Sequence, residues 1–104
     1  MNHIMEIARF AVVDGVESDT VPDRARIIDG WLGRQTGFVR RTLVGPDDEG
    51  RWTDLVEWRS RDDAMAAAAA IGQDPELEPF MAIIDSASVE MRHIPVVATL
   101  EGVA

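Results

Sequence analysis

Three charged or titratable residues stand in segments of this sequence that are otherwise largely apolar. They are Arg9, Asp54 and His93. A histidine can accept a proton near neutral pH, while a carboxylate can orient it and an arginine can stabilise an anion. We therefore take His93, Asp54 and Arg9 as the candidate catalytic group, able to polarise a carbonyl or a phenol without a metal ion. The alternative is a structural Arg–Asp ion pair beside a hydrogen-bonded core histidine, because such pairs also occur away from active sites.

Large apolar side chains could form a flat pocket next to this group. The candidate lining residues are Trp31, Trp58, Phe80 and Met91. Ligand pockets are lined mainly by aromatic and apolar side chains with a few polar groups, so this set predicts a small aromatic ligand. The alternative is that the same side chains only fill the core.

The composition argues against several classes of partner. The 104-residue chain has a net charge of −9, and all ten of its basic residues are arginines. Such an acidic chain repels phosphate backbones and anionic lipids, so we expect neither nucleic-acid nor membrane binding. The amino terminus has neither the basic region nor the long apolar run of a signal peptide, which favours a cytoplasmic protein.

The sequence also lacks several motifs that carry chemistry. It contains no cysteine and two histidines, so we expect no metal site and no cofactor. It has neither the Gly-x-Ser-x-Gly elbow of serine hydrolases nor a glycine-rich phosphate loop after a strand. Nucleophilic catalysis therefore has no support in the sequence.

The order of elements that must position these residues is β-α-β-β-α-β. Strands are expected over residues 4–13, 38–44, 52–59 and 88–97, with helices over 20–35 and from 61 into a broken second part ending near 85. Ser60 followed by Asp63 is a helix-start signal. This order predicts one ferredoxin-like α+β domain over residues 1–104, an antiparallel sheet with both helices on one face.

Alternation along the strands assigns side chains to the two faces of that sheet. Asp54 and Trp58 share the more apolar face of the third strand, and Met91 and His93 share that of the fourth, so we expect both faces to lie beneath the helices. We place Arg9 on the same face. In the sheet order 4-1-3-2 the first strand lies between the third and fourth, so Arg9 could bridge Asp54 and His93.

The other face of the sheet is mixed in character. It carries Leu55, Glu57 and Arg92, and a lone unit would leave its apolar side chains in water. A second subunit packed on this face would cover them and give a homodimer, a dimeric α+β barrel. The alternative is a monomer with an open amphipathic face.

Three stretches of the chain resemble the small dimeric α+β barrel proteins of the antibiotic biosynthesis monooxygenase type. They are MEIARFAVVDGV, WTDLVEWRSRDDAMAAAA and DPELEPFMAIIDSASVEMRHIPV. The resemblance covers nearly the whole chain and implies a homodimer with a pocket between helices and sheet in each subunit. It implies cofactor-free oxidation of phenolic or quinol substrates as one activity and haem degradation as another.

The residues of this chain depart from the haem-degrading branch, which carries a tryptophan and an axial histidine on the second helix. The segment 62–85 has neither, so haem degradation is disfavoured. Three hypotheses remain: a cofactor-independent monooxygenase in which His93 is the base, a non-catalytic ligand-binding or stress-related dimer, and an isomerase or cyclase in which His93 moves a proton. The chain has no tyrosine, which cofactor-free oxygenases of this type tend to use, and this favours the binding protein slightly.

Overall fold

The strands form one antiparallel sheet in the computed structural model, which describes residues 2–103. They are β1 (Ile4–Phe10), β2 (Phe38–Val44), β3 (Trp52–Trp58) and β4 (Glu90–Pro95). Their order in the sheet is β2-β3-β1-β4, and each neighbouring pair is antiparallel. The predicted ferredoxin-like α+β fold is therefore confirmed, with β1 in the interior and β4 at an edge.

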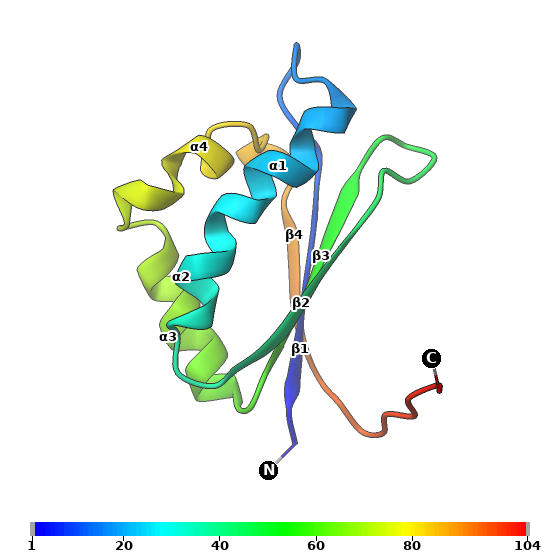
Figure 1. Ribbon diagram of the computed structural model, residues 1–104, viewed down its shortest axis with the longest axis vertical. Helices are drawn as coiled ribbons and strands as arrows, with labels where there is room; N and C mark the ends of the chain where they lie inside the picture. The colour runs from blue at the N-terminus through cyan, green and yellow to red at the C-terminus, as the bar shows by residue number, and fades with distance from the viewer. Residues whose placement is uncertain (1, 104) are drawn as a thin grey trace.

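All helices cover one face of this sheet (Figure 1). The first helical connection contains η1 (Ser18–Thr20), α1 (Val21–Ala25), η2 (Arg26–Ile28) and α2 (Asp29–Gly33). The second contains α3 (Arg61–Ile71), η3 (Pro75–Leu77) and α4 (Glu78–Met81), and the short η4 (Ser86–Ser88) leads into β4. The helical segment predicted for residues 20–35 is present over residues 21–33, but it is not one continuous α-helix, because the 3₁₀ turn η2 interrupts it.

The start of α3 follows its sequence signal. The Ser60 side chain accepts a hydrogen bond from the backbone N–H of Asp63 at 3.1 Å, which satisfies one of the free donors of the first turn. Gly37, just before β2, has φ +82° and lies against the Asp63 side chain. These contacts fix where α3 leaves the end of β3.

The core lies between the sheet and the helices. Trp58 is 1% exposed and packs edge-on against Phe38, with ring centroids 5.9 Å apart. The predicted burial of Trp58 is therefore confirmed. The pairing Ile4↔Trp58 and Phe10↔Trp52 shows that the even-numbered residues of β1 share the helix-covered face with the even-numbered residues of β3.

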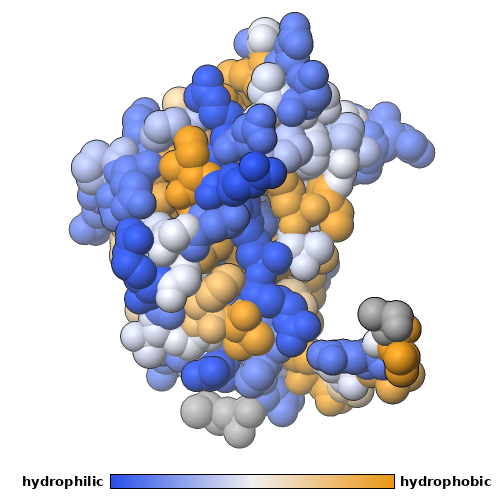
Figure 2. All heavy atoms as spheres, viewed as in Figure 1, coloured by the Kyte–Doolittle hydropathy of each residue, from blue (hydrophilic) through white to orange (hydrophobic). Residues whose placement is uncertain are grey.

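The opposite face of the sheet is free of helices, and the chain after β4 leaves the body of the domain near it (Figure 1). Residues 96–103 contain no helix or strand. Val97, Leu100 and Val103 in this segment are almost fully exposed, which Figure 2 shows as hydrophobic atoms on the projecting end. Within residues 2–103 no helix combines the length and apolarity that crossing a membrane requires.

Candidate active site

An apolar cavity of about 190 Å³ lies between the sheet and the helices. Its walls come from β1, β3, η2, α2, α3 and α4, and Met81, Val89 and Met91, which are all partly exposed, form its rim. Among the described residues of the lining, the charged side chains are Glu6 and Asp54. The cavity is therefore an apolar space with two carboxylates on its sheet wall, the composition expected of a small-molecule site.

Asp54 is held by Arg41 of β2 through a bidentate ion pair. Arg41 Nε donates to Asp54 Oδ1 at 2.7 Å and Arg41 Nη2 donates to Oδ2 at 2.6 Å. Both side chains are about nine-tenths buried. Burial disfavours the charged form of Arg41, but its hydrogen bonds to Asp54 and then to Asp29 outweigh this, so the pKa of Arg41 is raised above its ordinary value. A charge pair with this geometry fixes both side chains in place.

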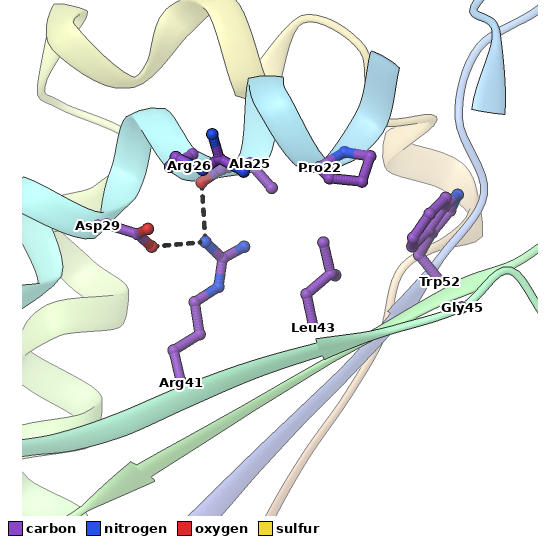
Figure 3. Close-up of a pocket in the computed structure, with 8 residues that line it drawn as sticks. All are labelled: Pro22, Ala25, Arg26, Asp29, Arg41, Leu43, Gly45 and Trp52. Atoms are coloured by element: carbon purple, nitrogen blue, oxygen red, sulfur yellow. Dashed lines mark hydrogen bonds and ion pairs between the residues drawn. The ribbon is translucent and has the colours of Figure 1, made fainter. Parts of the chain in front are cut away.

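Arg41 also joins the sheet to the first helical layer (Figure 3). Its Nη1 donates to the carbonyl oxygen of Ala25 at 2.8 Å and to Asp29 Oδ1 at 3.1 Å. In Figure 3 the guanidinium rises from β2 toward these two acceptors, on the floor of an open cleft of about 380 Å³ that also includes Trp52. Because Asp54 lines the inner cavity and Arg41 lines this outer cleft, their ion pair is part of the wall between the two.

The second carboxylate of the cavity, Glu6 of β1, lies beside His93 of β4. His93 Nε2 is 3.0 Å from Glu6 Oε1, and the two side chains are 13% and 15% exposed. Burial raises the pKa of Glu6 above its usual value, the bond and charge of His93 oppose this, and the negative charge of Asp54 adds to it. Glu6 is thus a buried carboxylate whose proton affinity is increased, as expected of an acid–base group.

The structure places His93 and Asp54 on the predicted face, but the predicted position of Arg9 is wrong. Arg9 lies on the open face of the sheet, where its guanidinium binds Asp47 at 2.8 Å and reaches Glu49 and Glu90. The physical reason is parity, since Arg9 pairs with Thr53 rather than with a residue of the Asp54 face. Asp54 and His93 are therefore each paired, but with Arg41 and Glu6.

The four residues predicted to line a pocket divide between two adjoining cavities. Phe80 and Met91 line the cavity of about 190 Å³. Trp31 and Trp58 line a smaller one of about 100 Å³, which shares Glu6 and Met91 with the first. Trp58 is almost fully buried, and its indole Nε1 has no hydrogen-bond partner among the described residues.

Sequence reasoning missed Glu6 and Arg41. The signal for Arg41 was present, because it lies two residues from Leu43 on the face of β2 that meets Val56 and Asp54. Glu6 is a charge between Ile4 and Ala8 of β1, but Arg9 stands between apolar residues in the alternate set, and only the strand pairing distinguishes the two. Within residues 2–103, no group of three or more His, Cys, Asp or Glu side chains has the arrangement of a metal site.

No protein-family model matches the chain, and comparison with curated protein sequences gives no significant match. Solved structures do match it, over nearly its whole length. SnoaB, a cofactor-independent oxygenase from Streptomyces nogalater, is 21% identical, with 98% of this chain and 100% of that chain covered and a TM-score of 0.74.

Two further matches have the same architecture. An antibiotic biosynthesis monooxygenase is 14% identical, with 91% of this chain and 99% of that chain covered and a TM-score of 0.67. A dimeric ferredoxin-like protein from an uncultured marine organism is 11% identical, with 99% and 95% covered and a TM-score of 0.66. The chain therefore has the fold of the antibiotic biosynthesis monooxygenase-type proteins that its sequence resembles.

Proposed function

We propose that this protein is a cofactor-independent monooxygenase that oxidises a small, reduced aromatic substrate of the phenol or quinol type in the inner cavity. The observation that carries the proposal is the apolar cavity with Glu6, paired with His93, and Asp54, held by Arg41, on one wall. The proposal is also supported by the similar fold of SnoaB, a cofactor-independent oxygenase.

The chemistry requires a base and a dry, shaped space. The substrate loses a proton to the Glu6–His93 pair, either from the hydroxyl of the phenol or from the CH₂ group of its keto tautomer. Both give the same electron-rich anion, which passes one electron to dioxygen. Recombination of the two radicals forms a carbon–oxygen bond and a peroxide anion, to which the Glu6–His93 pair returns the proton. Loss of water from the resulting hydroperoxide leaves a carbonyl. Overall R₂CH₂ + O₂ gives R₂C=O + H₂O, with one oxygen atom in each product. The protein supplies proton transfer, orientation and exclusion of water.

Each polar group of the cavity has a part in this scheme. The Glu6–His93 pair receives the proton, and Asp54, immobilised by Arg41, orients a substrate hydroxyl from the neighbouring position on the wall. Phe80 and Met91 contact the rings from the helix side and the rim. Arg9, on the open face, has no part in it.

Oxidation of anthrone, the keto form of a fused-ring phenol, tests the proposal. With isotopically labelled dioxygen, the wild-type protein should consume oxygen faster than buffer and place one labelled atom in anthraquinone and the other in water. His93→Ala should lower this rate by about 10²-fold or more, the usual contribution of acid–base catalysis. Anthrone binding without oxygen consumption would support the binding protein instead, and a rearranged product without oxygen uptake would support the isomerase or cyclase.

We also propose that the open face of the sheet is the contact of a homodimer. Leu55 and Ile7 lie on this face, and Ile94 on it is 39% exposed. The match to a dimeric ferredoxin-like protein supports the proposal. Sedimentation at micromolar concentration should give twice the chain mass, and Leu55→Asp should reduce it to one, whereas a monomeric wild type would contradict the barrel.

A further inference from the structure

Glu6 occupies the position on the cavity wall that the sequence suggested for His93. Its side chain lines both cavities, the larger one next to Asp54 and Phe80 and the smaller one next to Trp58. Among the described residues that line these two cavities, His93 does not occur. Of the Glu6–His93 pair, the carboxylate rather than the imidazole therefore lines the cavities.

The hydrogen bond between the two leaves one carboxylate oxygen available. His93 Nε2 lies against Glu6 Oε1 at 3.0 Å. Within residues 2–103, Glu6 Oε2 has no hydrogen-bond partner. It is not fully buried, unlike the unpartnered Nε1 of Trp58. Oε2 is therefore the carboxylate oxygen left without a partner within residues 2–103, on a side chain that lines both cavities, while Oε1 is tied to the imidazole.

We propose that Glu6, through Oε2, is the group that accepts the hydrogen bond and then the proton of the ligand hydroxyl, and that His93 is a positioning residue that holds Glu6. The proton-transfer part rests on the proposed function, whereas the hydroxyl contact stands without it. The inference also defines the ligand: a neutral aromatic molecule with a hydroxyl donor.

The charges around Glu6 support this ligand class. Glu6 faces His93 from β4 and Asp54 from β3, and the helices contribute the apolar side chains of Leu32 and Ile71. Arg41 is fully engaged by Asp54, Asp29 and the carbonyl of Ala25, so it offers little to an anionic ligand. Two carboxylates in an apolar space repel a ligand that arrives as a carboxylate or phenolate and favour one that arrives as a neutral donor. Once Glu6 has accepted the proton, its own negative charge no longer opposes the anion that forms.

The raised pKa of Glu6 agrees with its proposed role as the group that accepts the proton of the ligand. Burial is the largest influence and raises it, the hydrogen bond to His93 lowers it, and the net pKa lies above the usual value. A carboxylate with increased proton affinity is a better match for the proton of a hydroxyl than an ordinary surface carboxylate. The imidazole limits the increase, so Glu6 remains able to accept.

The chain contains a matched control for this pair. His3 Nδ1 lies 2.7 Å from Glu57 Oε2, and the Glu57 side chain is 10% exposed. Glu57 follows Val56 on β3 and therefore belongs to the open face, away from the cavity. Glu57→Gln removes a buried carboxylate beside a histidine from the same sheet without touching the cavity.

The test uses para-nitrophenol, whose absorption spectrum distinguishes the phenol from the phenolate. Bound to the wild-type protein across a pH series, it should be held as the phenol, so that its apparent pKa rises. Glu6→Gln should weaken binding of the phenol form by about tenfold, the loss of one charge-assisted hydrogen bond, and remove the rise. His93→Gln, which keeps a donor to Glu6, should retain the preference for the phenol and shift only its pH dependence. Glu57→Gln should behave as wild type.

Other outcomes overturn the inference. If Glu6→Gln binds the phenol as tightly as wild type, or if His93→Gln loses the preference while Glu6→Gln keeps it, Glu6 is not the contact. Should Glu6→Gln fail to fold, Glu6→Asp withdraws the carboxylate by one carbon and must show the same loss of affinity. The binding experiment needs no turnover, so a protein that binds para-nitrophenol through Glu6 but leaves anthrone unoxidised would contradict the proposed function alone.

Discussion

Replacement of Arg41 by methionine is expected to be among the most damaging single changes in this protein. Arg41→Met keeps an unbranched apolar stem but removes the guanidinium, and so leaves Asp54, 7% exposed, without its cation. Two short hydrogen bonds to Asp54, at 2.6 and 2.7 Å, and one to the carbonyl of Ala25 at 2.8 Å disappear together. Breaking a buried ion pair by removing one partner costs about 3–5 kcal/mol. This is a large part of the ~5–15 kcal/mol that stabilises a typical domain.

Urea unfolding followed by tryptophan fluorescence measures the loss, since the chain contains three tryptophans. Asp29→Ala is the control, because it removes the more exposed carboxylate partner of Arg41 and should cost less than about 1 kcal/mol. The double variant Arg41→Met with Asp54→Leu should recover most of the lost stability, because no unpaired charge then remains in the core. If Arg41→Met costs no more than Asp29→Ala, the ion pair is hydrated and the reasoning about the cavity wall fails.

Three further predictions concern the core, the cavity and a helix start. Trp58→Ala should lower the unfolding free energy by about 3–5 kcal/mol. Trp58→Phe should cost clearly less, because it also removes a buried Nε1 donor that has no partner. Equal losses of the two variants in urea melts would contradict this. Burial raises the pKa of Glu6 above its ordinary value of 4.5, so the folded protein binds this proton more tightly than the unfolded chain does. The resulting stabilisation is complete below pH 4.5 and is lost as the pH rises through the raised pKa. Glu6→Gln should therefore gain stability relative to wild type between acidic and neutral pH, and a pH-independent difference in thermal melts would argue against the raised pKa. Ser60→Ala should cost about 1 kcal/mol through loss of the α3 cap, and no change in amide exchange at Asp63 would count against the cap.

Local patterns were enough to predict the helices and strands and, for most strand residues, the face of the sheet on which each side chain lies. Alternation in β3 correctly placed Asp54 and Trp58 together beneath the helices, because side chains two apart on a strand share a face. Ser60 was correctly predicted as a helix cap for the same local reason. The ends of the first and last strands were less well predicted, since β1 ends at Phe10 and β4 at Pro95.

The residues of β1 alone could not show which of its two alternating sets of side chains lies beneath the helices. Its even-numbered set contains Glu6 and its odd-numbered set contains Arg9, and both sets are otherwise apolar. A one-residue choice of parity moves every side chain to the other face. The pairing with β3, which places Ala8 opposite Asp54, decided that Glu6 and not Arg9 faces the cavity.

The sequence by itself determined the order of strands and helices, the acidic charge without lysine, and the presence of a titratable histidine and a carboxylate on helix-covered strands. These depend on neighbours along the chain. The tertiary structure alone decided which charges meet: Arg41 with Asp54, and Glu6 with His93, a pair separated by 87 positions. Partners so far apart in sequence are chosen by strand register and by the cost of burying an unpaired charge, and neither is contained in a local pattern.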